Sequence, residues 1–166
     1  FSAFEILWNR GSKLRLVICG IKGWMQDALL SRIQKHPLFG EKLFWLDGAS
    51  EYTLDILYRN CTGVLVASEG EGFGLPLVEA GSIGKPILAR DIPVFREVAG
   101  DNATYFSGDV NELSSSIIRW VASIHDASAP NSRLIRCVNW RESARQFMSL
   151  ILSQDNPGWT YKITFE

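Results

Sequence analysis

The chain has 166 residues, of which 46% are hydrophobic and 21% charged, and 17 basic residues nearly balance 18 acidic ones. This length and composition predict one globular domain with a sizeable core. A net charge of −1 gives no reason to expect a nucleic-acid partner, so any phosphate binding must be local. No apolar run reaches the roughly 20 residues of a transmembrane helix. The three widely spaced cysteines favour a reducing compartment, with neither a disulfide framework nor a metal site.

Strand and helix patterns alternate along the chain. Residues 1–9 have the spacing of an amphipathic helix that ends near Gly11, and Ser50 is suited to cap a later helix. The short apolar run LRLVIC before Gly20 predicts a strand that is buried on both faces, and GVLVA before Ser68 predicts a further strand. We expect strands at 14–19, 42–46, 63–67, 86–89 and 104–106, and further helices at 24–35, after Ser50, and at 75–83, 94–99, 110–125, 133–138 and 141–152.

Short strands joined by crossover helices are typical of an α/β doubly wound fold, a parallel sheet with helices on both faces. We interpret residues 1–153 as one Rossmann-like domain. Residues 154–166, which contain Pro157 and Gly158, are interpreted as a tail or linker. Because Phe1 falls inside a helical pattern and is not a methionine, we expect the chain to be a fragment of a longer protein.

The stretch SEGEGFGLPLVEAGSIGKP, residues 68–86, has the features of a ligand site. It follows a strand, and in such sheets ligands bind beyond the carboxyl ends of the strands. Gly70, Gly72 and Gly74 allow positive φ and close backbone approach. Pro76 suits the first turn of a helix. The unpaired N–H groups around Phe73 to Leu75 would then form an anion site at the positive helix end.

The glycine spacing alone is weak evidence. It is neither the dinucleotide fingerprint nor a Walker A loop, and it also fits a plain strand–turn–helix connection. Two glutamates sharpen the signal. Glu79 is expected among apolar neighbours, where an ionised side chain is costly unless it is hydrogen-bonded. A nucleoside diphosphate sugar would satisfy all parts, because the helix end would hold its phosphates while Glu71 and Glu79 accept hydroxyls of its two sugars.

SEGEGFGLPLVEA resembles the Glu-seven-residues-Glu motif of the retaining glycosyltransferases of family 4, which have the GT-B fold. The resemblance extends over most of the chain, through LRLVICGIKGW, FWLDGASEYTLDILYRNC, GKPILARDIPVFREVAGDNATYF and NWRESARQFMSLI. It implies that Glu71 is the catalytic residue that contacts the transferred sugar, and that Glu79 binds the ribose diol. The remaining contacts to the sugar donor would come from Gly20, Lys22, Ala49, Gly72, Phe73, Gly74 and Leu75.

Among these contacts, the resemblance gives the backbone around Phe73, Gly74 and Leu75 to the diphosphate, the loop near Ala49 to the base and Gly20 to the lining of the cleft. Lys22 would contact phosphate, or it is an ordinary solvated lysine. Trp24 and Trp140 are expected in the core or at an interface and not at the ligand. The resemblance also implies no metal and no cofactor besides the nucleotide sugar.

The chain departs from the family pattern in what it lacks. The Arg/Lys pair that the family carries just before this region is absent, as are the first strand of this domain and the N-terminal domain that holds the acceptor. The resemblance therefore implies the C-terminal, sugar-donor-binding half of a GT-B enzyme.

RDIPVFREVAGD resembles mannosyltransferases of bacterial surface polysaccharide assembly, such as those of O-antigen. We therefore expect GDP-mannose as donor, with a UDP-hexose or UDP-N-acetylhexosamine as the alternative. The acceptor would be a saccharide or lipid-linked saccharide. The expected location is the cytoplasm or the cytoplasmic face of the inner membrane. Two rival interpretations remain, a non-catalytic nucleotide-binding module and a hydrolysing epimerase of the GT-B fold.

Overall fold

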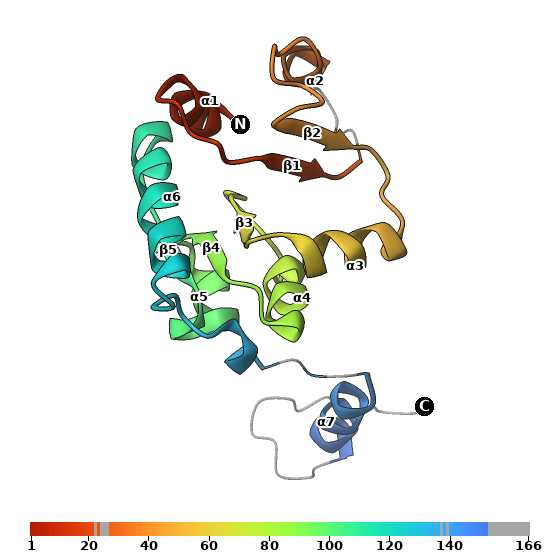
Figure 1. Cartoon of the computed structure of the whole chain (residues 1–166). Helices are drawn as coiled ribbons and strands as arrows, with labels where there is room; N and C mark the ends of the chain where they lie inside the picture. The colour runs from red at the N-terminus through yellow and green to blue at the C-terminus, as the bar shows by residue number, and fades with distance from the viewer. Residues whose placement is uncertain (22, 24–26, 137, 139, 153–166) are drawn as a thin grey trace. The chain divides into compact units, whose positions relative to one another are not determined.

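The computed structural model describes residues 1–21, 23, 27–136, 138 and 140–152 (Figure 1). The chain forms two compact units, Phe1–Arg136 and Cys137–Glu166. The second unit contains the helix α7, Trp140–Leu152. The predicted boundary between residues 153 and 154 lies outside the described residues.

The first unit begins with a helix and two parallel strands. Helix α1 is followed by β1, α2 and β2, and β1 pairs with β2 in parallel, with Leu16 opposite Leu43 and Cys19 opposite Leu46. Helix α3 then leads to the remaining strands. These elements span Ser2–Asn9 (α1), Leu16–Cys19 (β1), Asp27–Gln34 (α2), Leu43–Leu46 (β2) and Glu51–Asn60 (α3).

The remaining strands form a second parallel ladder in the order β3-β4-β5. The helices α4 and α5 are the crossovers between them, and α6 follows β5. These elements span Val64–Val66 (β3), Leu75–Ile83 (α4), Ile87–Arg90 (β4), Pro93–Ala99 (α5), Gly100–Asn102 (the 3₁₀ helix η1), Thr104–Phe106 (β5), Val110–His125 (α6) and Ser132–Leu134 (the 3₁₀ helix η2).

The strands are thus parallel and alternate with helices, as the sequence predicts, but they form a two-stranded and a three-stranded sheet. In a doubly wound fold with the strand order 3-2-1-4-5-6, the first strand lies between the second and the fourth. The two sheets of this domain are separated at the corresponding place.

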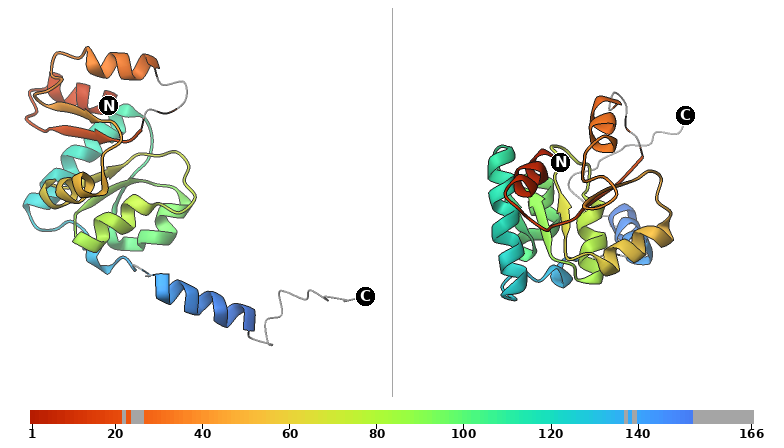
Figure 2. Two further views of the ribbon diagram at one scale, coloured as in Figure 1. Left: turned by 90° about the vertical axis from the view of Figure 1, so that its right-hand side faces the viewer. Right: turned by 45° about the horizontal axis from the view of Figure 1, so that its top comes forward.

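Helices α1 and α6 are neighbours and contact each other (Figures 1 and 2). They enclose an apolar cluster with one face of both sheets. The opposite face of the three-stranded sheet packs on α4 and α5 in a second cluster. The first cluster includes Phe4, Leu7, Trp8, Ile33, Leu43, Leu88, Phe106, Ile117 and Trp120, and the second includes Val66, Leu77, Ala80, Ile87, Ala89, Phe95 and Ile135.

The strand β1 is not buried on both faces, so this prediction was wrong. Leu16 and Ile18 face the first cluster, but Cys19 is exposed and Val17 is 41% exposed. The apolar run correctly gave the strand. Burial on its second face would require a covering element, and the run contains no information about that element.

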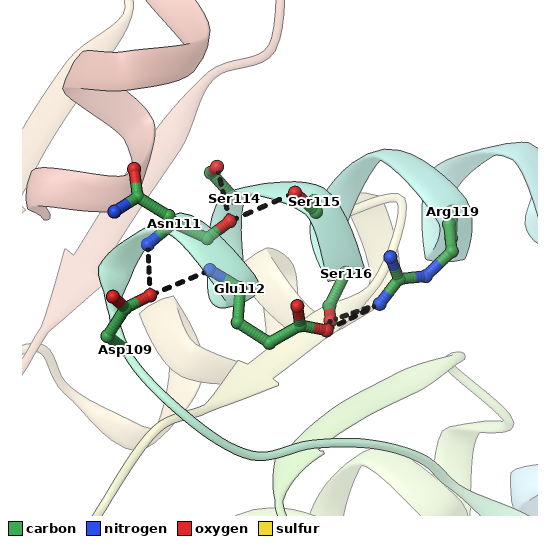
Figure 3. Close-up of polar contacts among 7 residues, drawn as sticks. All are labelled: Asp109, Asn111, Glu112, Ser114, Ser115, Ser116 and Arg119. Atoms are coloured by element: carbon green, nitrogen blue, oxygen red, sulfur yellow. Dashed lines mark hydrogen bonds and ion pairs between the residues drawn. The ribbon is translucent and has the colours of Figure 1, made fainter.

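The start of α3 has its predicted cap, and α6 has a cap that was not predicted. The Ser50 hydroxyl accepts a hydrogen bond from the Thr53 N–H at 3.2 Å. At α6 the Asp109 carboxylate accepts hydrogen bonds from two backbone N–H groups (Figure 3). The bonds to Ser50 and Asp109 satisfy N–H groups that have no partner within the first turn of each helix. Further along α6, the Arg119 guanidinium donates to the Glu112 carboxylate.

The predicted helix at 133–138 is instead the single 3₁₀ turn η2, so this prediction was wrong. The Asn131 side chain accepts from the Arg133 N–H, and the backbone is extended at Ile135. Gly81 of α4 explains the close packing of this segment, because a Cβ there would lie 2.9 Å from the Ser132 carbonyl oxygen. Contact with α4 therefore overrides the local helical pattern.

Candidate functional site

The loop between β3 and α4 requires glycine at one position. Gly74 directly precedes α4 with φ 87° and ψ 46°, the left-handed region. A Cβ at Gly74 would lie 3.0 Å from the Phe95 ring. Gly70 and Gly72 would also allow positive φ, but neither adopts it. Nothing lies within 4 Å of a Cβ built at either residue, so the loop is open to a ligand there.

The N-terminus of α4 can accept an anion. Pro76 occupies the first turn, and within the described part of the chain no side chain caps this end. The N–H groups of a first helical turn have no carbonyl partner inside the helix, and they carry partial positive charge. Phe73 and Leu75 are 57% and 61% exposed, so the helix start faces solvent. This geometry suits a phosphate group, and diphosphate binding at Gly72 to Leu75 stays a prediction.

Glu71 is exposed in the loop that precedes α4. The Ser68 hydroxyl donates a hydrogen bond to its Oε1 at 3.0 Å. Ser68 comes two residues after the end of β3. The carboxylate is therefore oriented from the end of the strand, on the N-terminal side of the helix start, and it remains accessible to a ligand.

Glu79 does not lie among apolar neighbours, and the burial argument for it was wrong. The inward face of α4 carries Leu77, Ala80 and Gly81, all buried, while Glu79 is on the exposed face. The Tyr58 hydroxyl donates a hydrogen bond to its Oε2 at 2.7 Å. The carboxylate is thus oriented by one partner on α3 and not by desolvation.

Sequence reasoning missed Tyr58 as a site residue, because its position beside Leu54 and Leu57 indicated only the apolar face of a helix. Its ring packs against the second cluster. Burial, and then the hydrogen bond to Glu79, raise the pKa of its hydroxyl well above the ordinary value.

Arg90 is a second residue that the sequence did not single out. It is the last residue of β4, and its Nε donates to the Ala67 carbonyl at 3.1 Å. Its guanidinium lies over the Phe106 ring, 5.1 Å from the centroid, and 3.9 Å from the Glu69 carboxylate. Arg90 therefore fixes the start of the loop that carries Glu71 and brings a positive charge to that edge of the sheet.

The other predicted contacts lie at the carboxyl ends of β1 and β2. The Gly20 N–H donates to the Leu46 carbonyl at 3.2 Å, and Ala49 is half-buried just before α3. Lys22 and Trp24 lie outside the described residues. Trp140, predicted in the core or at an interface, is 92% exposed on α7 of the second unit, and its place at an interface stays a prediction.

Two further properties of the described residues concern metal ligands and membrane-spanning helices. Among the described residues, no three His, Cys, Asp or Glu side chains lie together as metal ligands would. Within the same residues, no helix has the length and apolar character to cross a membrane.

The sequence matches a protein-family model described as "Glycosyl transferases group 1" over residues 1–147. It is 40% identical over 144 residues to the "Serotype-specific mannosyltransferase WbdA" of Escherichia coli, which covers 86% of this chain and 18% of that protein. It is 34% identical over 121 residues to the "O-antigen chain mannosyltransferase RfbU" of Salmonella typhimurium, covering 73% of this chain and 33% of RfbU.

Solved structures show a similar arrangement. The crystal structure of TarM superposes with a TM-score of 0.70 at 18% identity, over 91% of this chain and 31% of TarM. The pneumococcal O-GlcNAc transferase GtfA, in complex with UDP and GlcNAc, superposes with a TM-score of 0.54 at 26% identity, over 74% of this chain and 24% of GtfA. These likenesses support the fold, that of one part of a GT-B glycosyltransferase.

Proposed function

The chain belongs to the glycosyl transferases group 1, and on that premise we propose that it binds the nucleotide sugar in an enzyme that transfers a hexose, mannose in the first instance. The acceptor is a growing surface polysaccharide or a lipid-linked oligosaccharide. The chain spans about a fifth of the length of WbdA, the first relative named above, which it matches over 18%. The acceptor site would accordingly belong to another part of the complete protein, which acts in the cytoplasm or at the inner face of the membrane.

One observation carries this proposal: two accessible, oriented carboxylates flank an uncapped helix N-terminus. Glu71 lies before the start of α4 and is hydrogen-bonded by Ser68, and Glu79 lies one turn into α4 and is hydrogen-bonded by Tyr58. The diphosphate binds the N–H groups at the start of the helix. Glu71 accepts hydroxyls of the transferred sugar, and Glu79 accepts those of the ribose.

In the proposed reaction, the bond between the anomeric carbon and the diphosphate oxygen breaks, and a bond from that carbon to an acceptor hydroxyl oxygen forms. The acceptor proton passes to the departing diphosphate. The N–H groups at the start of α4 stabilise the negative charge that develops on the diphosphate. Glu71 holds the sugar so that the acceptor attacks on the face from which the diphosphate leaves, which retains the configuration.

The proposed sugar donor is GDP-mannose. Two relatives are named mannosyltransferases, and one of them is an O-antigen enzyme. The alternative is a UDP-sugar, which the complex of GtfA with UDP and GlcNAc favours. Ala49, which would lie beside the base, is a half-buried residue in the loop after β2. Backbone contacts of this kind would accept either base.

A panel of nucleotide sugars offered to the complete protein tests the proposal. We expect GDP-mannose to give the fastest release of nucleoside diphosphate, and Glu71→Gln to slow it strongly. If nucleoside diphosphate were released from a UDP-sugar and not from GDP-mannose, the UDP-sugar would be the donor. A protein that binds nucleotide but turns over no donor, with or without acceptor, would instead be a non-catalytic binding module. Release without any acceptor, together with an epimerised sugar, would support the epimerase.

A further inference from the structure

Tyr58 connects Glu79 to the packed interior of the domain. It lies on α3, whereas Glu79 lies on the neighbouring helix α4. The Tyr58 ring packs against the second cluster, with Val66, Leu77 and their neighbours, and its hydroxyl donates to Glu79 Oε2 at 2.7 Å. One end of this side chain is therefore held by packing, and the other end holds the carboxylate.

The hydrogen bond between these two side chains can run in one direction only. Burial and the neighbouring carboxylate raise the pKa of the Tyr58 hydroxyl, so it stays protonated and donates at neutral pH. A hydrogen bond to a charged acceptor is shorter and stronger than one between neutral groups. Without it, Glu79 would be an exposed glutamate on a helix surface, free to occupy several rotamers.

This bond leaves most of the carboxylate available to a ligand. Among the described residues, Tyr58 is the only side chain that donates to the Glu79 carboxylate, and it uses Oε2. A carboxylate offers about four acceptor positions on two oxygens. Two adjacent hydroxyls can therefore bind Glu79 while Tyr58 remains in place.

We propose that Tyr58 is a positioning residue, which orients the Glu79 carboxylate for the paired hydroxyls of the nucleotide ribose. The inference rests on the proposed function, because it needs Glu79 at the ribose. Tyr58 does not contact the ligand. It fixes the carboxylate before the ligand arrives, so less conformational freedom is lost on binding.

Tyr58→Phe in the complete protein tests this inference, because it keeps the ring and removes only the hydroxyl. Tyr52→Phe, on the same helix at a residue that is 75% exposed, is the matched control. Calorimetry measures binding of GDP and UDP, and the tighter of the two is compared with its 2′-deoxy form. Turnover is measured with the nucleotide sugar that the panel identifies.

We expect Tyr58→Phe to raise the Kd of the nucleotide and the KM of the nucleotide sugar about three- to tenfold, the usual effect of one hydrogen bond. The kcat should stay within about twofold, since a group fixed equally in ground and transition states affects binding alone. The preference for ribose over 2′-deoxyribose should shrink. Tyr52→Phe should change none of these quantities.

The double variant Tyr58→Phe/Glu79→Ala should bind nucleotide as Glu79→Ala does, because Tyr58 acts only through Glu79. A further loss in the double variant, or an unchanged affinity in Tyr58→Phe, would overturn the inference and leave the proposed function standing. Full nucleotide affinity in Glu79→Ala would instead overturn the ribose assignment. The ratio of ribose to deoxyribose affinity does not depend on how much protein is folded, so poor folding of a variant would not spoil the test.

Discussion

The two sheets of this domain are built from similar residues but are covered differently. The strand β1 reads LVIC and β4 reads ILAR, and both pair in parallel with a neighbour. Ile87, Leu88 and Ala89 of β4 are at most 1% exposed, whereas Val17 of β1 is 41% exposed. An apolar run thus specifies a strand. Its burial depends on which elements cover it, since β4 has helices on both faces and β1 does not.

The covered sheet also carries the better-defined part of the site. Glu71, the start of α4 and Arg90 are all attached to β3 or β4, and Glu79 follows on α4. The open sheet contributes Gly20 and Ala49, which offer only backbone. A rigid support fixes side chains to within the tolerance that binding requires. Under the proposed function, the groups that would recognise the sugar and the ribose therefore lie on the covered sheet and on α4.

The largest expected effect tests the difference in coverage directly. Leu88→Ala should destabilise the domain by about 2–5 kcal/mol, because it leaves a cavity at a fully buried position. Val17→Ala on β1 should cost about 0.5 kcal/mol or less, as surface substitutions do. Urea denaturation of the two variants measures both values. Equal losses would mean that β1 is covered in solution as β4 is.

The second prediction concerns the loop on the covered sheet. Glu71→Ala in the complete enzyme should lower transfer by up to about 100-fold, because the sugar loses the group that positions it. Free nucleotide should still bind, since the proposed function gives Glu71 contact with the sugar alone. Glu69→Ala, two residues away and 89% exposed, is the control and should have little effect. A comparison of turnover with nucleotide affinity checks this. Loss of both in Glu71→Ala would indicate that Glu71 supports the loop.

Much of the covered part could be predicted from the sequence, because its signals are local. The bounds of α4, β5 and α6 were predicted to the residue, since Gly74, Gly84 and Asp109 mark helix ends through their own backbone or side chain. The Glu-seven-residues-Glu spacing likewise identified the family. The roles of the site residues, Lys22 included, stay predictions.

What the sequence did not reveal depends on contacts between distant segments. Tyr58 and Glu79 are 21 positions apart, and only the packing of α3 on α4 brings them together. Arg90 at the end of β4 donates to Ala67, which follows the adjacent strand β3 and is 23 positions away. The exposure of Glu79 could have been anticipated, because Leu77 and Ala80 already define the inward face of α4. Its apolar neighbours in sequence were mistaken for neighbours in space.

The third prediction concerns the turn that joins the covered sheet to α4. Gly74→Ala should cost about 1–2 kcal/mol for the left-handed backbone alone. The contact at 3.0 Å with Phe95 adds to this loss. Gly72→Ala should be neutral or slightly stabilising, because its backbone is not left-handed and nothing lies within 4 Å. Thermal unfolding of the pair measures the difference. Similar midpoints would mean that the turn relaxes at little cost.

The smallest expected effect concerns the N-terminal caps of α6 and α3, which differ in charge. The cap of α6 is the Asp109 carboxylate, and two backbone N–H groups hold its pKa below the ordinary value. The cap of α3 is the neutral hydroxyl of Ser50. A depressed pKa in the folded state means that stabilisation by Asp109 is complete above its unfolded pKa, about 3.9, and is lost as the pH falls through the folded pKa.

The stability difference between the wild type and Asp109→Asn should therefore be constant near neutral pH and shrink as the pH falls below about 4. The difference for Ser50→Ala should not depend on pH, because a hydroxyl does not titrate in this range. Denaturation midpoints from pH 7 down to pH 3 would measure both. If the Asp109→Asn difference did not change with pH, the carboxylate would cap α6 no better than an amide, and the two helix starts would be energetically alike.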